Sequence, residues 1–295
     1  MTLERLDPAM VTGRRVVTHE GVRIHFRDHG GPGDTPLVLL HGLTANAWCF
    51  EGLVGAGLAK VRRTISIDLR GRGESDKPAA GYSMADHAAD VLLVIDALGA
   101  KGAVPFGHSF GGLLAMYLAS RHPGRFERLI VADAAGPAVQ NPATMQLIGP
   151  SLLRLGKVSA SLAAFLDEMR RMPFLEGRWY PELEAYYRAD VEVRDDGTVT
   201  TRSTPAVIAQ VIERVKEEDW AAHIRGVHQP TLFLHALGGY GPPGTPPVIL
   251  EEQAAEMKRD LRDCRYFSVP GNHMTMLFGE GAEQVVGRVA SFLGG

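Results

Sequence analysis

A serine set between glycines is the feature of this sequence that most directly predicts chemistry. Residues 107–111 read Gly-His-Ser-Phe-Gly and match the G-x-S-x-G pattern of a nucleophilic serine. Glycines two positions before and after Ser109 suit a strained turn from a strand into a helix, because a Cβ at either position would collide with neighbouring backbone. Such a turn exposes the Ser109 hydroxyl at the carboxyl end of the strand, where it can attack a carbonyl carbon.

The segments on either side of Ser109 have the pattern that this turn requires. An apolar stretch precedes the serine, and a helix-like stretch, Phe110–Arg121, follows it and stops before Pro123. Pro105 lies in the preceding stretch and lacks the N–H that a central strand uses for pairing. We therefore expect a local bulge or an unpaired position at Pro105.

Strand and helix patterns alternate along most of the chain. Solid apolar runs at Pro36–Leu40 and Leu129–Ala132 indicate strands that are buried on both faces, and Ser83 and Gly99 delimit a helix over Met84–Leu98. Further strands are predicted at Val22–Asp28, Thr64–Asp68, Thr231–His235 and Arg265–Val269, and further helices near Ile249–Leu261 and Glu283–Phe292. The alternation predicts an α/β fold with a mostly parallel central sheet covered by helices on both faces, and functional groups at the carboxyl ends of its strands.

Residues 137–228 depart from this alternation. They consist of helical patches rich in leucine, methionine and aromatic residues, with a predicted hairpin over Val191–Arg202 that turns at Asp195-Asp196-Gly197. We therefore expect residues 1–136 and 229–295 to form the core domain. Residues 137–228 are expected to form a helical lid, inserted between the strands Leu129–Ala132 and Thr231–His235.

The composition fits a soluble enzyme. The 295 residues are 45% hydrophobic, and the net charge of −3 without a basic run argues against a nucleic-acid partner or an anionic membrane surface. The first residues lack the apolar region of a signal peptide and no apolar run is long enough to span a bilayer, so we expect a cytoplasmic protein. Cys49 and Cys264 are expected to be free thiols. The spacing of His223, His228 and His235 does not suit a metal, and we expect neither a metal nor a cofactor.

Four motifs occur in an order that resembles the α/β-hydrolase fold family, and the resemblance extends from Val22 to Leu293. The motifs are His41-Gly42-Leu43 after a buried strand, Asp68–Ser75 after the next strand, Gly107–Gly111, and Gly271-Asn272-His273 after the last strand. In this family the histidine of the first motif and the turn corresponding to Asp68–Ser75 are structural. We interpret His108 as a packed neighbour of the serine.

The same resemblance implies roles for four residues. Ser109 would be the nucleophile, and His273 would be the base that takes its proton and later passes it to the leaving group. The backbone N–H groups of Leu43 and Phe110 would form the oxyanion hole.

The sequence departs from the family at the acidic residue. Most members carry an aspartate shortly after the strand that corresponds to Thr231–His235, but residues 236–241 contain no acid. A minority, including haloalkane dehalogenases and some lipases, place the acid at the end of the strand that follows the helix of the nucleophile. Asp133 occupies that position, so we expect it to orient His273, with Glu251 and Glu252 as the alternatives.

A serine in this motif argues against a dehalogenase or an epoxide hydrolase, which use an aspartate there. The sequence therefore predicts a carboxylic-ester hydrolase that acts on a small apolar ester or lactone, with Phe174, Trp179 and Met274 in the substrate pocket. A carbon–carbon bond hydrolase, an amidase, a thioesterase or a perhydrolase could use the same residues, and a non-catalytic ligand receptor could use the same fold. Nothing in the sequence indicates an oligomeric state.

Overall fold

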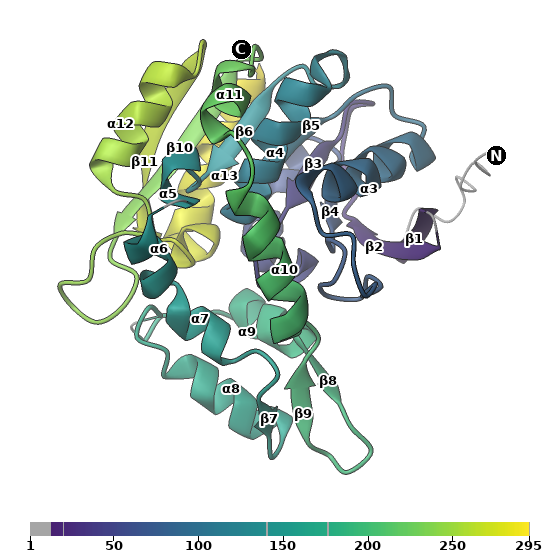
Figure 1. Cartoon of the computed structure of the whole chain (residues 1–295), viewed down its shortest axis with the longest axis vertical. Coiled ribbons are helices and arrows are strands. Elements are labelled where there is room, and N and C mark those ends of the chain that lie inside the picture. The colour runs from purple at the N-terminus through teal and green to yellow at the C-terminus, as the bar shows by residue number, and fades with distance from the viewer. Residues whose placement is uncertain (1–12, 20, 140, 176, 295) are drawn as a thin grey trace.

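The computed structural model describes residues 13–19, 21–139, 141–175 and 177–294. Its centre is one eight-stranded sheet in the order β1-β2-β4-β3-β5-β6-β10-β11 (Figure 1). The strands are β1 (Gly13–His19), β2 (Val22–Asp28), β3 (Leu37–Leu40), β4 (Thr64–Ile67), β5 (Val104–His108), β6 (Leu129–Ala132), β10 (Thr231–Gly238) and β11 (Cys264–Asn272). β2 pairs antiparallel with both β1 and β4, and all other neighbours are parallel. The predicted mostly parallel sheet is confirmed.

Helices cover the sheet, and its central strands are fully buried. Every residue of β3, β4, β5 and β6 is buried, as expected for strands with solid apolar runs. The helices of this part are α1 (Glu51–Gly55), α2 (Leu58–Val61), α3 (Met84–Ala97), α4 (Phe110–Arg121), α12 (Glu251–Asp260) and α13 (Gly279–Gly294). α4 packs on β5 and β6, and α13 packs on β10 and β11 from the opposite side (Figure 1).

The ends of α3 show how local sequence sets an element. The Ser83 hydroxyl accepts the backbone N–H of Asp86, and the Asp86 carboxylate accepts the backbone N–H of Ser83, which together form a capping box. Gly99 follows the helix with a φ of 70°, a conformation that glycine adopts without strain. The predicted bounds are therefore correct to within one residue.

Pro105 lies in β5 at a place where the pairing toward β6 is interrupted. β5 pairs with β3 from Val104 to Gly107 in continuous register, whereas its pairing with β6 begins only at Phe106. The backbone N–H of Val104 points to β3, so the nitrogen of Pro105 points to the β6 side, where it lies between a bridge of Ala103 with Phe126 and the pairing that starts at Phe106. Pro105 is thus unpaired on this side, and the register here shifts by one residue across it, so the local irregularity expected at Pro105 is present.

The segment between β6 and β10 forms helices and a small separate sheet. Its helices are α5 (Gly136–Val139), α6 (Pro142–Leu147), α7 (Gly149–Leu153), α8 (Leu162–Arg170), α9 (Pro181–Ala189), α10 (Pro205–Lys216) and α11 (Trp220–Arg225). Its strands β7 (Val158–Ser159), β8 (Val191–Val193) and β9 (Val199–Thr201) are antiparallel, and β8 with β9 forms the predicted hairpin. α7, α8, α9 and this small sheet form the lower end of the molecule in Figure 1, whereas α11 returns to pack on α4.

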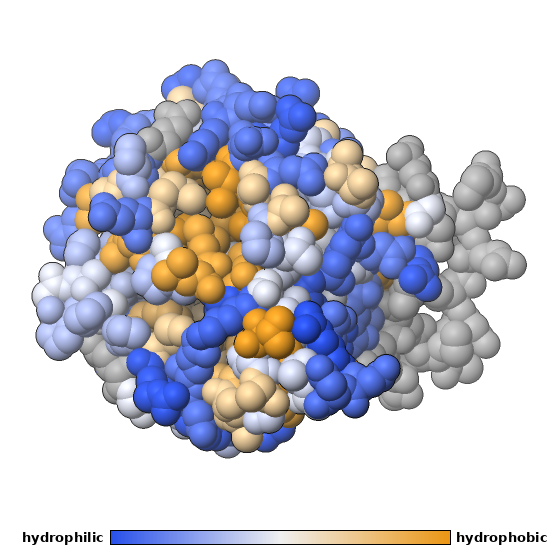
Figure 2. Space-filling view, turned by 60° about the horizontal axis from the view of Figure 1, so that its bottom comes forward, coloured by the Kyte–Doolittle hydropathy of each residue, from blue (hydrophilic) through white to orange (hydrophobic). Residues whose placement is uncertain are grey.

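The outer face of this segment is partly apolar. Figure 2 turns the lower end of the molecule forward and shows apolar residues near the centre of that face, with polar residues around them. Leu153 of α7 and Val193 of β8 are exposed apolar side chains of this segment. No helix within the described ranges is both long enough and apolar enough to cross a bilayer.

Candidate active site

Ser109 occupies the turn between β5 and α4 in a strained conformation. Its φ of 56° and ψ of −121° are unusual for a residue with a side chain, and the surrounding packing has to hold it there. The flanking glycines make the turn sterically feasible. A Cβ on Gly107 would lie 2.0 Å from the carbonyl oxygen of Gly111, and a Cβ on Gly111 would lie 1.9 Å from that of Leu40.

Ser109, His273 and Asp133 are brought together in one hydrogen-bonded chain. The Ser109 Oγ lies 3.0 Å from His273 Nε2, and His273 Nδ1 lies 2.6 Å from Asp133 Oδ2. Asp133 follows β6, is fully buried, and accepts the backbone N–H of Ala236 with Oδ1 at 3.0 Å. Among the described residues other than glycine, only Ser109 and Asp133 have a positive φ. Strained backbone is thus concentrated at two of the predicted functional residues.

His273, which follows β11, is held in place by contacts with several other segments. The neutral His108 ring donates from Nε2 to the carbonyl oxygen of His273 at 2.7 Å and packs at 4.6 Å between ring centroids. Burial lowers the pKa of His108 to about 3, so this ring stays uncharged near pH 7. Tyr240 contacts His273 edge-on, and the Asn272 side chain ties the loop to the carbonyl oxygens of Phe174 and Gly239.

The loop after β3 places Leu43 beside the serine. A Cβ on Gly42 would lie 3.7 Å from the Ser109 Oγ, in the space that a reacting carbonyl group needs. His41 accepts the backbone N–H of Leu69 with Nε2, so Nδ1 carries the hydrogen and donates to the carbonyl oxygen of Gly42 at 2.8 Å. That oxygen and the Leu43 N–H belong to one planar peptide and point in opposite directions, so His41 fixes the direction of the Leu43 N–H.

Burial and the nearby Arg72 lower the pKa of His41 to about 4, so its ring stays neutral and keeps these two hydrogen bonds. Phe110, the other predicted donor, is the first residue of α4, where a backbone N–H has no partner within the helix. The structure therefore places both predicted oxyanion donors next to Ser109.

The turn between β4 and α3 uses its polar groups internally. Asp68 accepts the backbone N–H groups of Ala47 and Glu74 and contacts His25 Nδ1 at 2.7 Å, while the Ser75 hydroxyl donates to the Asp68 carbonyl oxygen. These bonds position the turn next to the loop that carries His41, which agrees with a structural role.

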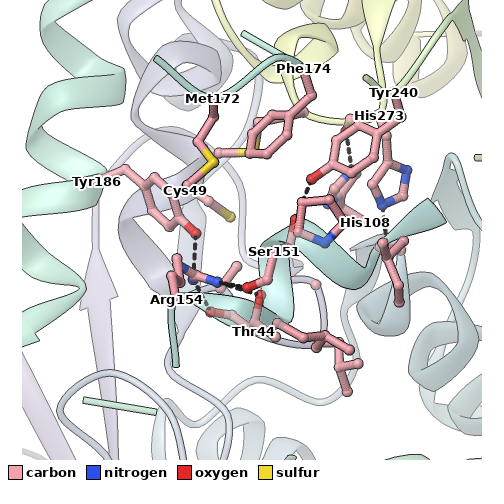
Figure 3. A pocket seen from close by; sticks show the side chains of 18 of the residues that line it. Thr44, Cys49, His108, Ser151, Arg154, Met172, Phe174, Tyr186, Tyr240 and His273 are labelled. Carbon is pink, nitrogen blue, oxygen red and sulfur yellow. Dashed lines mark hydrogen bonds between the residues drawn. The ribbon is translucent and has the colours of Figure 1, made fainter. Parts of the chain in front are cut away.

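Two cavities of different character meet at Ser109. One, of about 70 Å³, has a mostly apolar wall that includes methionines and Phe174, and it also carries polar groups of Thr44, Ser151, Arg154, Tyr186 and Tyr240, for which we call it the polar cavity (Figure 3). The other, of about 80 Å³, is lined mainly by aliphatic side chains, among them Leu113, Ala138, Val139, Ile212, Val215 and Ile249. Leu43, Ser109, Ile148 and His273 line both cavities.

Arg154 is the charged group of the polar cavity, and all of its N–H groups are engaged. Its Nε donates to Asp190 at 3.1 Å, and its Nη atoms donate to both oxygens of Thr44, to the Ser151 carbonyl oxygen and to the Tyr186 hydroxyl. Burial lowers the pKa of Arg154, but the Asp190 carboxylate, Tyr186 and Tyr187 together raise it by more, so the guanidinium remains charged. Figure 3 shows this side chain at the wall of the cavity, directed toward Thr44 and Tyr186.

Of the three pocket residues predicted from the sequence, Phe174 and Met274 line the polar cavity. Trp179 lies behind it and stacks on Tyr187, which is itself a lining residue. The polar residues Arg154, Tyr186 and Tyr240 were missed. An arginine within the apolar run Leu152–Leu155 was a usable signal, since such a residue needs a buried partner. Cys49 and Cys264 are free thiols, and no cluster with metal-ligand geometry occurs in the described part of the chain.

The chain is similar to hydrolases in sequence and in structure. A model of the alpha/beta hydrolase fold family matches residues 35–173. A non-heme chloroperoxidase of Streptomyces lividans is 36% identical over 125 residues, which are 42% of this chain and 45% of that protein. The 2-(acetamidomethylene)succinate hydrolase of Mesorhizobium japonicum is 30% identical over 207 residues, which are 68% of this chain and 70% of the relative. A crystal structure of E-2-(acetamidomethylene)succinate hydrolase superposes with a TM-score of 0.76 at 22% identity, covering 96% of this chain and 99% of that one.

Proposed function

Because the chain belongs to the α/β-hydrolase fold family, we propose that it hydrolyses carboxylic esters or lactones through an acyl-enzyme on Ser109. The observation that carries the proposal is the chain of hydrogen bonds from Ser109 through His273 to Asp133, at 3.0 Å and 2.6 Å. This is the arrangement of a nucleophile, its base and the group that orients the base.

In the proposed reaction, the Ser109 Oγ forms a bond to the substrate carbonyl carbon as its proton passes to His273 Nε2. The carbonyl oxygen becomes an oxyanion that accepts the N–H groups of Leu43 and Phe110. Asp133 stabilises the imidazolium, which then protonates the leaving alkoxide oxygen as the carbon–oxygen bond breaks. Water attacks the acyl-enzyme by the same steps, with His273 taking the proton of water and returning one to Ser109.

The two cavities support a neutral substrate that is largely apolar and carries a polar group on one side. Among the described residues that line them, Arg154 is the one arginine or lysine, and its N–H groups already have acceptors. A substrate carboxylate would have to displace the Asp190 or Thr44 contacts, and an uncharged ester or lactone avoids that cost. The hydroxyls of Ser151, Tyr186 and Tyr240 suit that polar group.

We further propose that residues 137–228 act as a lid over the catalytic residues. Ile148, Ser151, Met169, Phe174 and Tyr186 come from this segment and line the cavity next to Ser109. Their side chains exclude water from the reacting groups and limit the size of the substrate.

The test is an activity panel of p-nitrophenyl esters, lactones and anilides on the purified protein, beside Ser109→Ala. We expect ester or lactone turnover that Ser109→Ala abolishes, and covalent labelling of Ser109 by a fluorophosphonate. Turnover of anilides alone would replace the proposal with an amidase. A parent protein that neither hydrolyses a substrate nor reacts with the fluorophosphonate would point to a receptor.

A further inference from the structure

Arg72 is a buried cation without an anionic partner in the part of the chain that the structure describes. Its side chain has 0% exposure, and no ion pair involves it. The other buried arginines are paired: Arg70 binds Asp90 through Nε at 2.5 Å and Nη2 at 2.8 Å, and Arg154 binds Asp190. An arginine that is buried without a carboxylate is costly, so its retention calls for a compensating interaction.

Arg72 contacts both residues whose backbone N–H groups are the proposed oxyanion donors. Its Nε donates to the carbonyl oxygen of Leu43 at 3.0 Å, and its guanidinium carbon lies 5.1 Å from the centroid of the Phe110 ring. Nη1 contacts the Arg70 carbonyl oxygen at 2.6 Å and His87 Nε2 at 2.8 Å. Nη2 is buried and has no hydrogen-bond partner among the described residues. The guanidinium therefore sits directly behind the loop that carries the Leu43 N–H.

The groups around Arg72 are neutral acceptors. His87 donates from Nδ1 to the Ser83 carbonyl oxygen, so Nε2 offers a lone pair to Arg72. Burial lowers the pKa of His87 well below its usual value, which keeps that ring neutral. Burial also lowers the pKa of Arg72, to about 9, so the guanidinium is still protonated at pH 7. The positive charge is thus present at this position and is not cancelled by its nearest contacts.

We infer that Arg72 is a positioning residue of the oxyanion hole, which holds the carbonyl group of Leu43 through Nε and provides a positive charge that attracts the tetrahedral oxyanion. This inference rests on the proposed acyl-transfer function. The negative charge missing from the resting site appears on the substrate during the reaction, when the carbonyl oxygen gains the electron pair of its π bond. Arg72 therefore stabilises the transition state more than the bound substrate.

The size of the effect follows from the geometry. The Nε–Leu43 O distance is 3.0 Å, and the span from that oxygen through the Leu43 N–H to an oxyanion adds at most about 6 Å, so the charges lie within about 9 Å. At an effective dielectric constant of about 20, this attraction corresponds to roughly 20-fold in rate. Loss of the Nε hydrogen bond adds to that factor.

The experiment compares Arg72→Met, Arg72→Gln and Arg72→Lys with Arg70→Lys, a control in the same turn whose own side chain bonds to Asp90 and Gly81. Folding of each variant is checked by circular dichroism and Tm. The kinetic readouts are kcat and KM for an ester that the parent hydrolyses. The binding readouts are the inhibition constants of phenylboronic acid, which forms a tetrahedral anion on a nucleophilic serine, and of benzyl alcohol, which is neutral.

We expect Arg72→Met and Arg72→Gln to lower kcat at least 20-fold with KM within about threefold, and to weaken phenylboronic acid by a similar factor with benzyl alcohol unchanged. Arg72→Lys should recover most of both losses, and Arg70→Lys should keep kcat within about threefold of the parent. If Arg72→Met does not fold, Arg72→Gln and Arg72→Lys carry the comparison.

A folded Arg72→Gln protein with parental kcat and boronate affinity would overturn the inference, as would an Arg72→Lys protein no better than Arg72→Gln. These outcomes are distinct from failure of the proposed function. In that case the parent itself would hydrolyse no ester and bind no boronic acid.

Discussion

Replacement of Asp133 by asparagine should abolish base catalysis while the fold stays intact, because existing hydrogen bonds decide which way the new amide faces. Asp133 Oδ1 accepts the backbone N–H of Ala236, so the amide oxygen of an asparagine has to take that position. The NH₂ group then lies where Oδ2 was, 2.6 Å from His273 Nδ1. An NH₂ donor at that place requires Nδ1 to accept, which leaves the hydrogen on Nε2, facing Ser109. His273 then cannot take the Ser109 proton.

The expected loss is about 10⁴-fold in kcat, which corresponds to a rise of about 5.4 kcal/mol in the activation barrier. KM should change little, because Asp133 acts through the imidazole and its carboxylate has no role in holding the ground-state substrate. The backbone at Asp133 has a φ of 49°, a region that asparagine tolerates better than most residues. Tm should therefore stay within a few degrees of the parent.

The assay measures steady-state kinetics of Asp133→Asn and Asp133→Gly, with Glu251→Gln and Glu252→Gln as controls. Glycine accepts the positive φ and leaves space for a small carboxylate, so added acetate should raise kcat of Asp133→Gly at least tenfold and should not restore Asp133→Asn. The two glutamate variants should stay within about twofold of the parent. A folded Asp133→Asn protein with kcat within tenfold of the parent would show that Asp133 does not set the tautomer of His273.

Ser109→Ala and His273→Ala should each remove most of the activity, and the double variant should lose little more, since the two groups act as one unit. A double variant whose loss in activation free energy equals the sum of the two single losses would contradict this. Phe174→Ala should change how KM varies across a series of ester chain lengths, because Phe174 lines the cavity. Trp179 lies behind the cavity wall, so Trp179→Ala should lower Tm and leave the chain-length profile of KM unchanged. A Trp179→Ala protein with an altered KM profile and an unchanged Tm would place Trp179 in the site. Burial lowers the pKa of His29 to about 4, so between pH 6.5 and 4 the unfolded chain binds a proton that the folded chain excludes and stability falls as pH falls. His29→Gln should flatten the pH dependence of the unfolding free energy, measured by guanidinium titration, by about 1.4 kcal/mol per pH unit in that window; an unchanged slope would mean that His29 titrates alike in both states.

The sequence was sufficient for the fold because its signals are local. A strand buried on both faces must be apolar at every position, so Leu129–Ala132 could be located to the residue. Ser83 and Gly99 delimit α3 through short-range hydrogen bonds and backbone freedom. β1 was not predicted, because Gly13–His19 is an edge strand with polar residues and has no such run.

The site was predictable only where a motif fixes its own geometry. Spacing of glycines sets the turn at Ser109, and the end of a strand places Asp133. The contact of Arg154 with Thr44 joins residues that are 110 positions apart. No local sequence pattern predicts that the segment after α7 packs against the loop after β3. Arg72 belongs to the Asp68–Ser75 motif, for which the sequence predicts only a structural turn. Its isolation from carboxylates becomes visible only when the surrounding side chains are in place.

The register of the sheet explains why an acid after β6 can serve His273. His108 of β5 pairs with Ala132 of β6. Ser109 and Asp133 are the next residues of these two strands, so they lie side by side at the carboxyl edge of the sheet. The Ala236 N–H of β10 then binds the Asp133 carboxylate from the other side. With the acid on β6, the loop after β10 carries no carboxylate, and Tyr240 in that loop packs edge-on against His273 and contacts the Ser151 hydroxyl at 2.6 Å. Moving the acid by one strand thus converts a loop that would orient the base into a wall of the proposed substrate cavity.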